Sequence, residues 1–292
     1  MPYLLLLIGV YCCSTSIIFI KIGSTDPVAL SAYRLLLGGL FMVPLAYRSW
    51  KRRGAFSAGQ MFRQAAAPSV LLGIHFISWI FGGRLTPSAN ASLIVNMVPV
   101  VMPVFLLLVV GERINRPEGI GTVVAMMGVA ALGWADFNLS SDYAAGDLVC
   151  FISMLFYAYY LIYARKYRDM PSIYLYVVPV YLMGGLFCLL GGLAMELAGQ
   201  PIVWLGPDLK MEAISILGLA LIPTIFGHSL VNWAMTRIRS QAVVIINLAQ
   251  FIFAGTMGFL LLGEIPPAAF YLSSAMVVAG AVVIVRHSHQ NR

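Results

Sequence analysis

Apolar runs of about 20 residues, separated by short polar gaps, are the feature that most restricts how this chain can fold. A helix of about 20 mostly apolar residues crosses the hydrocarbon core of a bilayer. The whole chain is 61% hydrophobic and 10% charged, with a mean hydropathy of +0.90, whereas a soluble domain carries about 25% charged residues. The sequence therefore predicts an all-α membrane protein with ten transmembrane helices. They are expected at 3–22, 27–47, 66–84, 88–110, 117–135, 146–165, 173–196, 212–236, 240–262 and 267–285.

The basic residues are spread unevenly over the gaps between these runs. With both termini on one side of the membrane, 14 Lys and Arg residues fall on that side and 3 on the other. Cytoplasmic loops carry the excess of Lys and Arg, so we expect both termini in the cytoplasm and a multi-pass protein of the plasma membrane (the bacterial inner membrane). Topology then accounts for the net charge of +7, and no nucleic-acid partner is expected. The 14 are Arg48, Lys51, Arg52, Arg53, Arg63, Arg113, Arg116, Arg165, Lys166, Arg168, Arg237, Arg239, Arg286 and Arg292, and the three are Lys21, Arg84 and Lys210.

The two halves of the chain share a pattern of residues. Glu112 follows Ser88 by 24 positions and Glu264 follows Ser240 by 24 positions, and both stretches end on Gly-Glu. Trp79 follows Gly73 by six positions, and Trp233 follows Gly227 by six. Several matched positions in one order indicate an internal repeat.

The repeat unit is a set of five helices. We expect the first repeat at 1–140 and the second at 141–292. Because five is an odd number, the two copies must face opposite ways in the membrane. Inverted repeats are typical of secondary transporters, in which the copies exchange shapes to open the protein to one side and then to the other.

Four stretches of the chain share a pattern with a known family: Gly73–Trp79, Asn96–Pro99 with Gly111-Glu112, Gly227–Trp233, and Leu260–Glu264 with Pro266. They resemble the drug/metabolite transporter superfamily, EamA type. The resemblance implies ten helices in two inverted five-helix repeats and transport of small metabolites, with export the more usual direction. It also implies a midplane cavity lined by helices 1, 3, 4, 6, 8 and 9, and dimer contacts through helices 5 and 10. Many members have Glu-Pro thirteen residues before the last Glu of helix 9, where this chain has Gln250-Phe251, so it lacks both a kinking proline and a titratable carboxyl there.

Polar and aromatic residues inside the apolar runs are the candidate substrate-binding residues, because polar groups in hydrocarbon are costly and mark functional sites. A histidine there can bind substrate or a proton, or it can bond a neighbouring carbonyl and join two helices. Amides and small hydroxyls can line a cavity or hold helices together, and aromatic rings can stack on substrate or lie at the membrane interface. The candidates are His75, Trp79, His228, Asn232, Trp233, Gln250, Tyr157, Tyr160, Ser14 and Asn96.

Arg34 is the one basic residue within an expected span. It can extend to the membrane surface or pair with an acid. The resemblance adds contact with an anionic substrate as a third alternative, because some family members bind anions or carboxylates, and the sequence leaves these alternatives open. We expect no catalytic residue, no metal and no cofactor.

These features favour a secondary transporter, an exporter of small organic metabolites such as amino acids or related compounds, that works by alternating access around the cavity. No Walker motif is present, which leaves proton coupling or substrate gradients as the energy source. The alternative is a membrane-embedded enzyme acting on a lipid or isoprenoid substrate, but Asp136, Asp142 and Asp147 do not have the spacing of a diphosphate-binding array. A channel or structural subunit gives no reason for inverted repeats. The expected partners are the small-molecule substrate and membrane lipid, with the chain a monomer or a homodimer.

Overall fold

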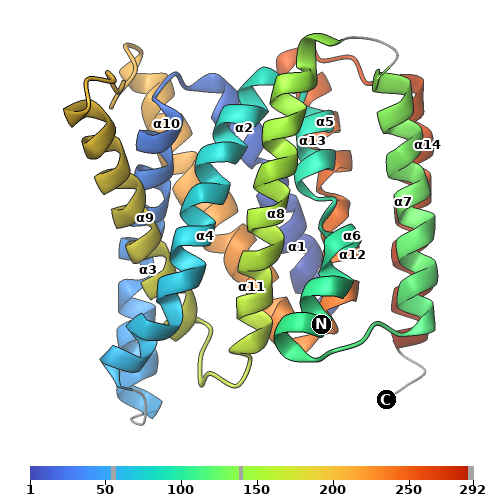
Figure 1. Ribbon diagram of the computed structural model, residues 1–292, viewed down its shortest axis with the longest axis horizontal. Coiled ribbons are helices and arrows are strands. Elements are labelled where there is room, and N and C mark those ends of the chain that lie inside the picture. Colours follow the sequence, from blue (N-terminus) through green and yellow to red (C-terminus); the bar gives the residue numbers. More distant parts are fainter. Residues whose placement is uncertain (54–56, 138–140, 289–292) are drawn as a thin grey trace.

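The computed structural model describes residues 1–53, 57–137 and 141–288, and this part of the chain is a bundle of helices without strands (Figure 1). Within the described residues, nine helices are long and apolar enough to cross a membrane. The helix α7 (Arg116–Phe137) fills the remaining place of the predicted ten, so the all-α membrane fold is confirmed. The other elements are α1 (Pro2–Ser14), α2 (Ser16–Ile22), α3 (Pro27–Arg53), α4 (Ala58–Leu85), α5 (Ser88–Val95), α6 (Val98–Phe105), η1 (Leu106–Val110), η2 (Ser141–Tyr143), α8 (Ala144–Lys166), α9 (Tyr174–Leu197), α10 (Leu209–Leu219), η3 (Ala220–His228), α11 (Ser229–Arg237), α12 (Ser240–Leu248), α13 (Gln250–Leu262) and α14 (Ala268–Ser288).

Several spans that the sequence predicts as single helices are interrupted. The first breaks at Thr15 between α1 and α2, the fourth at Asn96-Met97 between α5 and α6, and the ninth at Ala249 between α12 and α13. The eighth span contains the π-helical segment η3 between α10 and α11. The ninth span is therefore interrupted although it lacks the proline that many family members have. At this break the Ala249 and Ile252 N–H groups donate to the Ile246 and Ala249 carbonyls.

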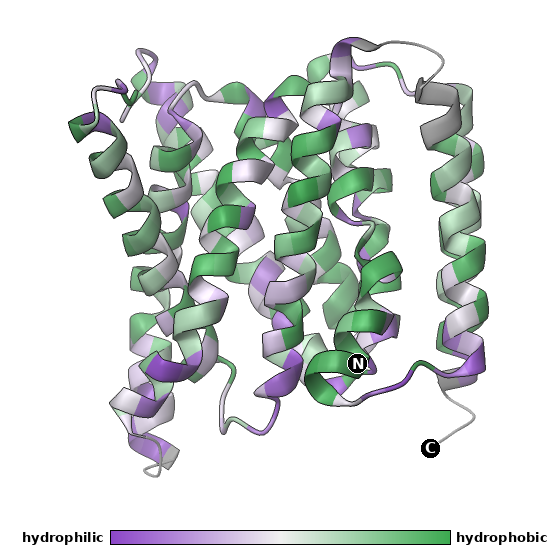
Figure 2. Ribbon diagram, in the orientation of Figure 1, coloured by the Kyte–Doolittle hydropathy of each residue, from purple (hydrophilic) through white to green (hydrophobic). Residues whose placement is uncertain are grey.

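Two pairs of helices flank the remaining helices of the bundle (Figure 1). The pair α7 and α14 stands at one edge of the bundle and the pair α3 and α9 at the other. The first pair is very close, since a Cβ atom on Gly280 would lie 2.5 Å from the carbonyl oxygen of Gly121. Apolar residues run along the helices, and hydrophilic residues gather at the two ends of the bundle (Figure 2). That distribution fits a protein whose sides face lipid.

Helix α1 begins and α14 ends at the same end of the bundle, which we call the terminal face; the other end is the opposite face (Figure 1). Two glycines with positive φ stop matching helices at these two faces, Gly111 (φ 68°) after η1 at the terminal face and Gly263 (φ 71°) after α13 at the opposite face. Glycine adopts this left-handed conformation without steric cost. Each glycine thereby places the next residue, Glu112 or Glu264, at one end of the bundle. Residues 138–140, at the expected boundary between the repeats, lie outside the described residues. Residues 289–292, at the C-terminus, lie outside them as well.

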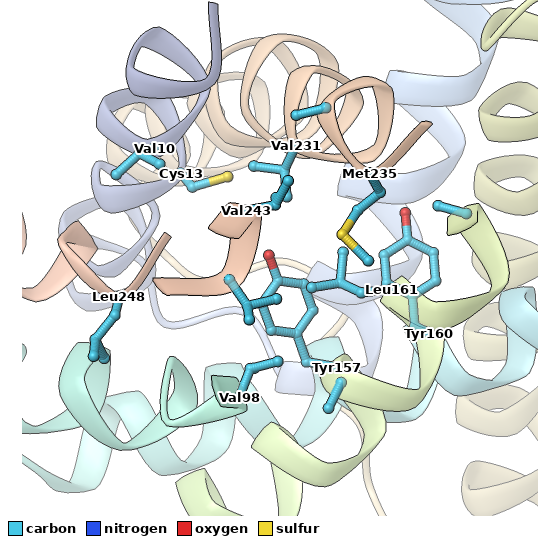
Figure 3. Packing of buried hydrophobic residues seen from close by; sticks show 14 of the residues in the cluster. Val10, Cys13, Val98, Tyr157, Tyr160, Leu161, Val231, Met235, Val243 and Leu248 are labelled. Atoms are coloured by element: carbon cyan, nitrogen blue, oxygen red, sulfur yellow. The ribbon is translucent and has the colours of Figure 1, made fainter. Parts of the chain in front are cut away.

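Apolar side chains of α1, α6, α8, α11 and α12 meet in one buried core (Figure 3). Val98, Leu161 and Val243 are fully buried within it. Tyr157 and Tyr160 of α8 belong to the same core, with their side chains 2% and 0% exposed. A buried tyrosine hydroxyl needs a hydrogen-bond partner, so the polar groups around these two residues indicate where a site can lie.

Candidate functional site

His75, near the middle of α4, is bound to the neighbouring helix α8. Its Nδ1 lies 2.8 Å from the Ser153 hydroxyl and 3.1 Å from the Ser153 carbonyl oxygen. The Ser153 hydroxyl in turn donates to the His75 carbonyl at 2.9 Å. Because that hydroxyl hydrogen is already used, Nδ1 must be the donor, and Nε2 is then the acceptor nitrogen of a neutral imidazole. His75 thus joins two helices through one nitrogen and presents a ring and an acceptor to the interior.

Aromatic rings surround this imidazole. Tyr157 stacks on His75 with ring centroids 4.6 Å apart and an interplanar angle of 15°. His228, the last residue of η3, lies edge-on to Tyr157 at 5.6 Å and to Phe76 at 4.9 Å. The predicted residues His75, Tyr157 and His228 are therefore neighbours, although they come from three helices.

Asn232, one turn after His228 on α11, connects this aromatic group to Tyr160. Its Nδ2 donates to the Tyr160 hydroxyl and to the His228 carbonyl, both at 2.6 Å. Its Oδ1 is buried without a hydrogen-bond partner. An unpaired buried acceptor is costly, and a donor on a bound molecule would satisfy it.

The broken helices meet at a set of three amides. Asn247 of α12 donates to Asn96 Oδ1 at 2.8 Å and to the Tyr157 hydroxyl at 3.3 Å, and Gln250 donates to Asn247 Oδ1 at 2.6 Å. Asn96 donates to the Ser92 carbonyl at 2.8 Å, which occupies a backbone acceptor next to the break. Helix interruptions in a membrane are tolerated where such groups satisfy the freed backbone. The three amides therefore join the break in the fourth span to the break in the ninth span.

Trp79 of α4 and Arg34 of α3 share one hydroxyl on α2. The Trp79 indole donates to Ser16 Oγ at 3.2 Å, and Arg34 Nη1 donates to the same oxygen at 3.5 Å. Arg34 Nε donates to Thr224 Oγ1 at 3.2 Å. Arg34 is fully buried and does not extend to the surface.

The structure thus brings together eight of the ten predicted residues, which we call the central cluster: His75, Trp79, Asn96, Tyr157, Tyr160, His228, Asn232 and Gln250. All are buried in this conformation. They combine flat aromatic faces with amide and imidazole groups, which suits a small molecule that has both an apolar and a polar part.

Ser14 and Trp233 occupy other places. The Ser14 hydroxyl donates to the Tyr11 carbonyl of its own helix at 2.6 Å, a bond that satisfies it locally. Trp233 lines a cavity of about 230 Å³ at the terminal face, together with Tyr176, Arg168 and Arg237. Trp233 therefore faces a cavity near the surface, although it follows the cluster residue Asn232 in the chain.

Ion pairs join helices at the terminal face. Arg165, at the end of α8, donates through Nε to Glu112 Oε2 at 2.8 Å. Arg239, which follows α11, donates through Nη2 to Glu118 at 2.9 Å and lies 4.0 Å from Glu112. Hydrogen bonding to the Glu118 carboxylate raises the pKa of Arg239 above its ordinary value. These contacts connect α8 and the α11–α12 junction to the ends of η1 and α7.

A matching ion pair lies at the opposite face. Lys21, at the end of α2, donates to Glu264, which also accepts the Ser88 backbone N–H at 2.8 Å. Burial acts to raise the pKa of Glu264, but the hydrogen bonds from Lys21 and Ser88 outweigh it and hold that pKa below its ordinary value. In each ion pair, the glutamate after a glycine-terminated helix joins a basic residue from the other half of the chain.

Sequence reasoning missed several partners of the predicted residues. Ser153, Ser16 and Thr224 supply hydroxyls to His75, Trp79 and Arg34. Each is a small polar residue within an apolar run, which the sequence alone could not distinguish from a residue that only permits close helix packing.

The chain resembles known membrane transporters along its length. The sequence model of the EamA-like transporter family matches residues 1–134 and again residues 144–286. An uncharacterized transporter of Archaeoglobus fulgidus is 24% identical over 99% of this chain and 98% of its own length. The aromatic amino acid exporter YddG of Ancylobacter novellus is 23% identical over 73% of this chain and 72% of its own length. A solved crystal structure, 17% identical, covers 99% of this chain and 98% of its own with a TM-score of 0.74, and so shares the fold.

Proposed function

Because the chain belongs to the EamA-like transporter family, we propose that this membrane transporter is a secondary exporter of small organic metabolites, such as amino acids or related compounds. The family and the matched relatives are transporters and not enzymes. The substrate class follows the relative whose name is aromatic amino acid exporter. The central cluster is the proposed binding site.

The pair of ion-paired closures on either side of the central cluster is the observation that carries the proposal. Glu112–Arg165 seals the terminal face and Lys21–Glu264 seals the opposite face. A carrier must be able to open one end while the other stays shut. Two separate ion pairs, each made by the two halves of the chain, would give it that ability as closures, one at each face.

The two five-helix repeats, 1–140 and 141–292, are proposed to exchange shapes during this cycle. The terminal face is proposed to be cytoplasmic in the bacterial inner membrane, because it carries most of the basic residues. Substrate would then enter for export through the cavity that Trp233 and Tyr176 line, beside Arg168 and Arg237. Proton coupling or substrate exchange would supply the energy.

Membrane lipid is proposed to cover the sides of the bundle, with the chain a monomer or a homodimer. The exposed apolar residues of α7 and α14, among them Val123, Met127, Leu272 and Val278, are suited to either contact.

Flux through liposomes tests the transport proposal. The purified protein is reconstituted, and uptake of radiolabelled amino acids and related metabolites is measured, with empty liposomes as the control. Saturable flux of a specific compound is expected. Absence of flux for the whole panel, with correctly inserted protein, would contradict the proposed substrate class.

His228→Ala tests the binding site. We expect lost flux with near-normal melting temperature, because the substitution removes an interior ring whose Nδ1 has no partner in the protein. A lower melting temperature with unchanged substrate affinity would instead assign His228 a packing role. His75→Ala is the matched comparison and should lower the melting temperature as well, since Nδ1 of that histidine joins α4 to Ser153 of α8.

A further inference from the structure

Arg34 is a cation inside the bundle whose hydrogen bonding is incomplete. Its side chain is fully buried, and its guanidinium carbon lies 3.6 Å from the centroid of the Phe76 ring. Nε and Nη1 donate to the hydroxyls of Thr224 and Ser16. Nη2 is buried and has no hydrogen-bond partner. A third nitrogen of the guanidinium therefore remains available for another molecule.

Nothing within the described part of the chain neutralises this charge. The ion pairs formed there involve other basic residues, and both hydrogen-bond partners of Arg34 are neutral hydroxyls. Contact with an aromatic face stabilises a guanidinium, but an unpaired charge in a membrane interior remains costly. A buried arginine that has no anionic partner in the protein is suited to bind an anion that enters from outside.

His228 is a second group with incomplete hydrogen bonding, and it contacts the same ring as Arg34. Its Nδ1 is buried without a hydrogen-bond partner, and its ring centroid lies 4.9 Å from that of Phe76. Arg34 and His228 thus both contact Phe76. In the tautomer with hydrogen on Nδ1, the imidazole is a donor. The Phe76 ring therefore has two buried groups beside it, each with a nitrogen that can donate to an anion.

We propose that the transported molecule carries a carboxylate that binds Arg34 Nη2 and His228 Nδ1, with its apolar part against the aromatic stack of His75 and Tyr157. This inference rests on the proposed function and names the chemical class of its substrate. A guanidinium forms short, charge-assisted bonds to a carboxylate. A single arginine balances one negative charge, which favours a carboxylate over a phosphate dianion.

Matched pairs of small molecules test the assignment. The full-length protein in detergent is titrated with L-phenylalanine and L-phenylalaninamide, and with 3-phenylpropionate and 3-phenylpropionamide, and binding is measured by calorimetry and by the shift in melting temperature. Each amide keeps the size of its acid and removes the negative charge. We expect each acid to bind at least about tenfold more tightly than its amide, since the acid alone gains a bond between charged groups.

Substitution of Arg34 identifies the residue responsible. Arg34→Gln should remove the preference for acid over amide while binding of the amides stays close to the wild type. Arg34→Lys should retain part of the preference, because it keeps the charge without the planar fork. Arg63→Gln, which changes an exposed arginine of α4, is the control and should leave the preference unchanged. If Arg34→Gln does not fold, the comparison of acids and amides on the wild-type protein still decides the charge requirement.

The outcomes separate this inference from the proposed function. Equal binding of acids and amides, or an unchanged preference in Arg34→Gln, would overturn the carboxylate assignment even if flux of neutral compounds is observed. Tighter binding of inorganic phosphate or chloride than of every carboxylate would overturn it as well. Arg34-dependent binding of acids without flux in liposomes would support the assignment and count against transport.

Discussion

Glu264→Gln should open the opposite face and leave the terminal face closed. The substitution keeps the shape of the side chain, removes its charge and so breaks the ion pair with Lys21. Gln can still accept the Ser88 N–H, but as a neutral acceptor, and charge-assisted bonds are about twice as strong as neutral ones. The closure of the opposite face should therefore weaken, while Glu112–Arg165 is unaffected.

The burial of the two side chains sets the magnitude. The Lys21 and Glu264 side chains are 16% and 28% exposed, so the pair is neither a surface pair nor a fully buried one. Exposed pairs contribute about 0–1 kcal/mol, and breaking a buried pair costs about 3–5 kcal/mol. We take about 2 kcal/mol as the loss, which corresponds to about a 30-fold change in the closure equilibrium.

Hydrogen exchange measured by mass spectrometry provides the assay, because local opening sets the exchange rate of protected amides. Peptides from the start of α5, whose Ser88 amide is bonded to Glu264, should exchange up to about 30-fold faster in the variant. Peptides from the end of α8 should keep the wild-type rate. Glu112→Gln is the mirror variant and should reverse this pattern.

A third variant controls for charge removal alone. Glu196→Gln changes an exposed glutamate at the same face, which accepts the Trp204 indole N–H at 2.8 Å. It should leave exchange at the start of α5 unchanged. Faster exchange at the terminal face in Glu264→Gln, or at neither face, would refute the assignment of Lys21–Glu264 as the closure of the opposite face.

Three further predictions concern pH, packing and topology. The folded state holds the pKa of Glu264 below its ordinary value. The wild type should therefore exceed Glu264→Gln in stability by the full amount above about pH 4.3, the pKa of an unperturbed glutamate. This difference should disappear as the pH falls through the lower folded-state pKa, and melting curves at pH 3–7 will test it. Gly280→Ala should lower the free energy of unfolding by about 1–3 kcal/mol, because its Cβ would meet the Gly121 carbonyl at 2.5 Å, whereas Gly191→Ala, with open space around it, should not; urea denaturation compares them. A reporter fused after Arg292 should be active only in its cytoplasmic format, and activity of a periplasmic reporter there would contradict the charge-based orientation.

The fold class could be predicted from the sequence because a bilayer sets the length of a spanning helix. A helix must contain about 20 apolar residues to cross it, so spans can be recognised from composition before any contact is known. The interruptions within the spans were not within reach. No proline marks the break at Ala249, and the nearby Asn247 bonds to Asn96, a residue far away in the chain.

The residue types of the candidate site could be predicted from the sequence, but the positions of their side chains could be predicted only in part. Placing a polar residue in hydrocarbon costs free energy, so such residues are usually functional. His75, His228 and Asn232 could be selected for this reason. The directions in which these side chains point could not be predicted. An α-helix has 3.6 residues per turn, and a short apolar run does not indicate which side of the helix faces the interior. Ser14 and Trp233 were therefore selected with the same reasoning, yet one bonds within its own helix and the other lines a peripheral cavity.

The sequence by itself determined that the chain is a membrane bundle and that its halves share a pattern, since both follow from residue type and spacing along one dimension. Only the tertiary structure decided which charges meet. The glutamates after Gly111 and Gly263 are alike in sequence, and it is the packing of the two halves that pairs one with Arg165 and the other with Lys21. The same packing leaves Arg34 buried without an acid, because a charge can be neutralised only by a group that the fold brings within reach.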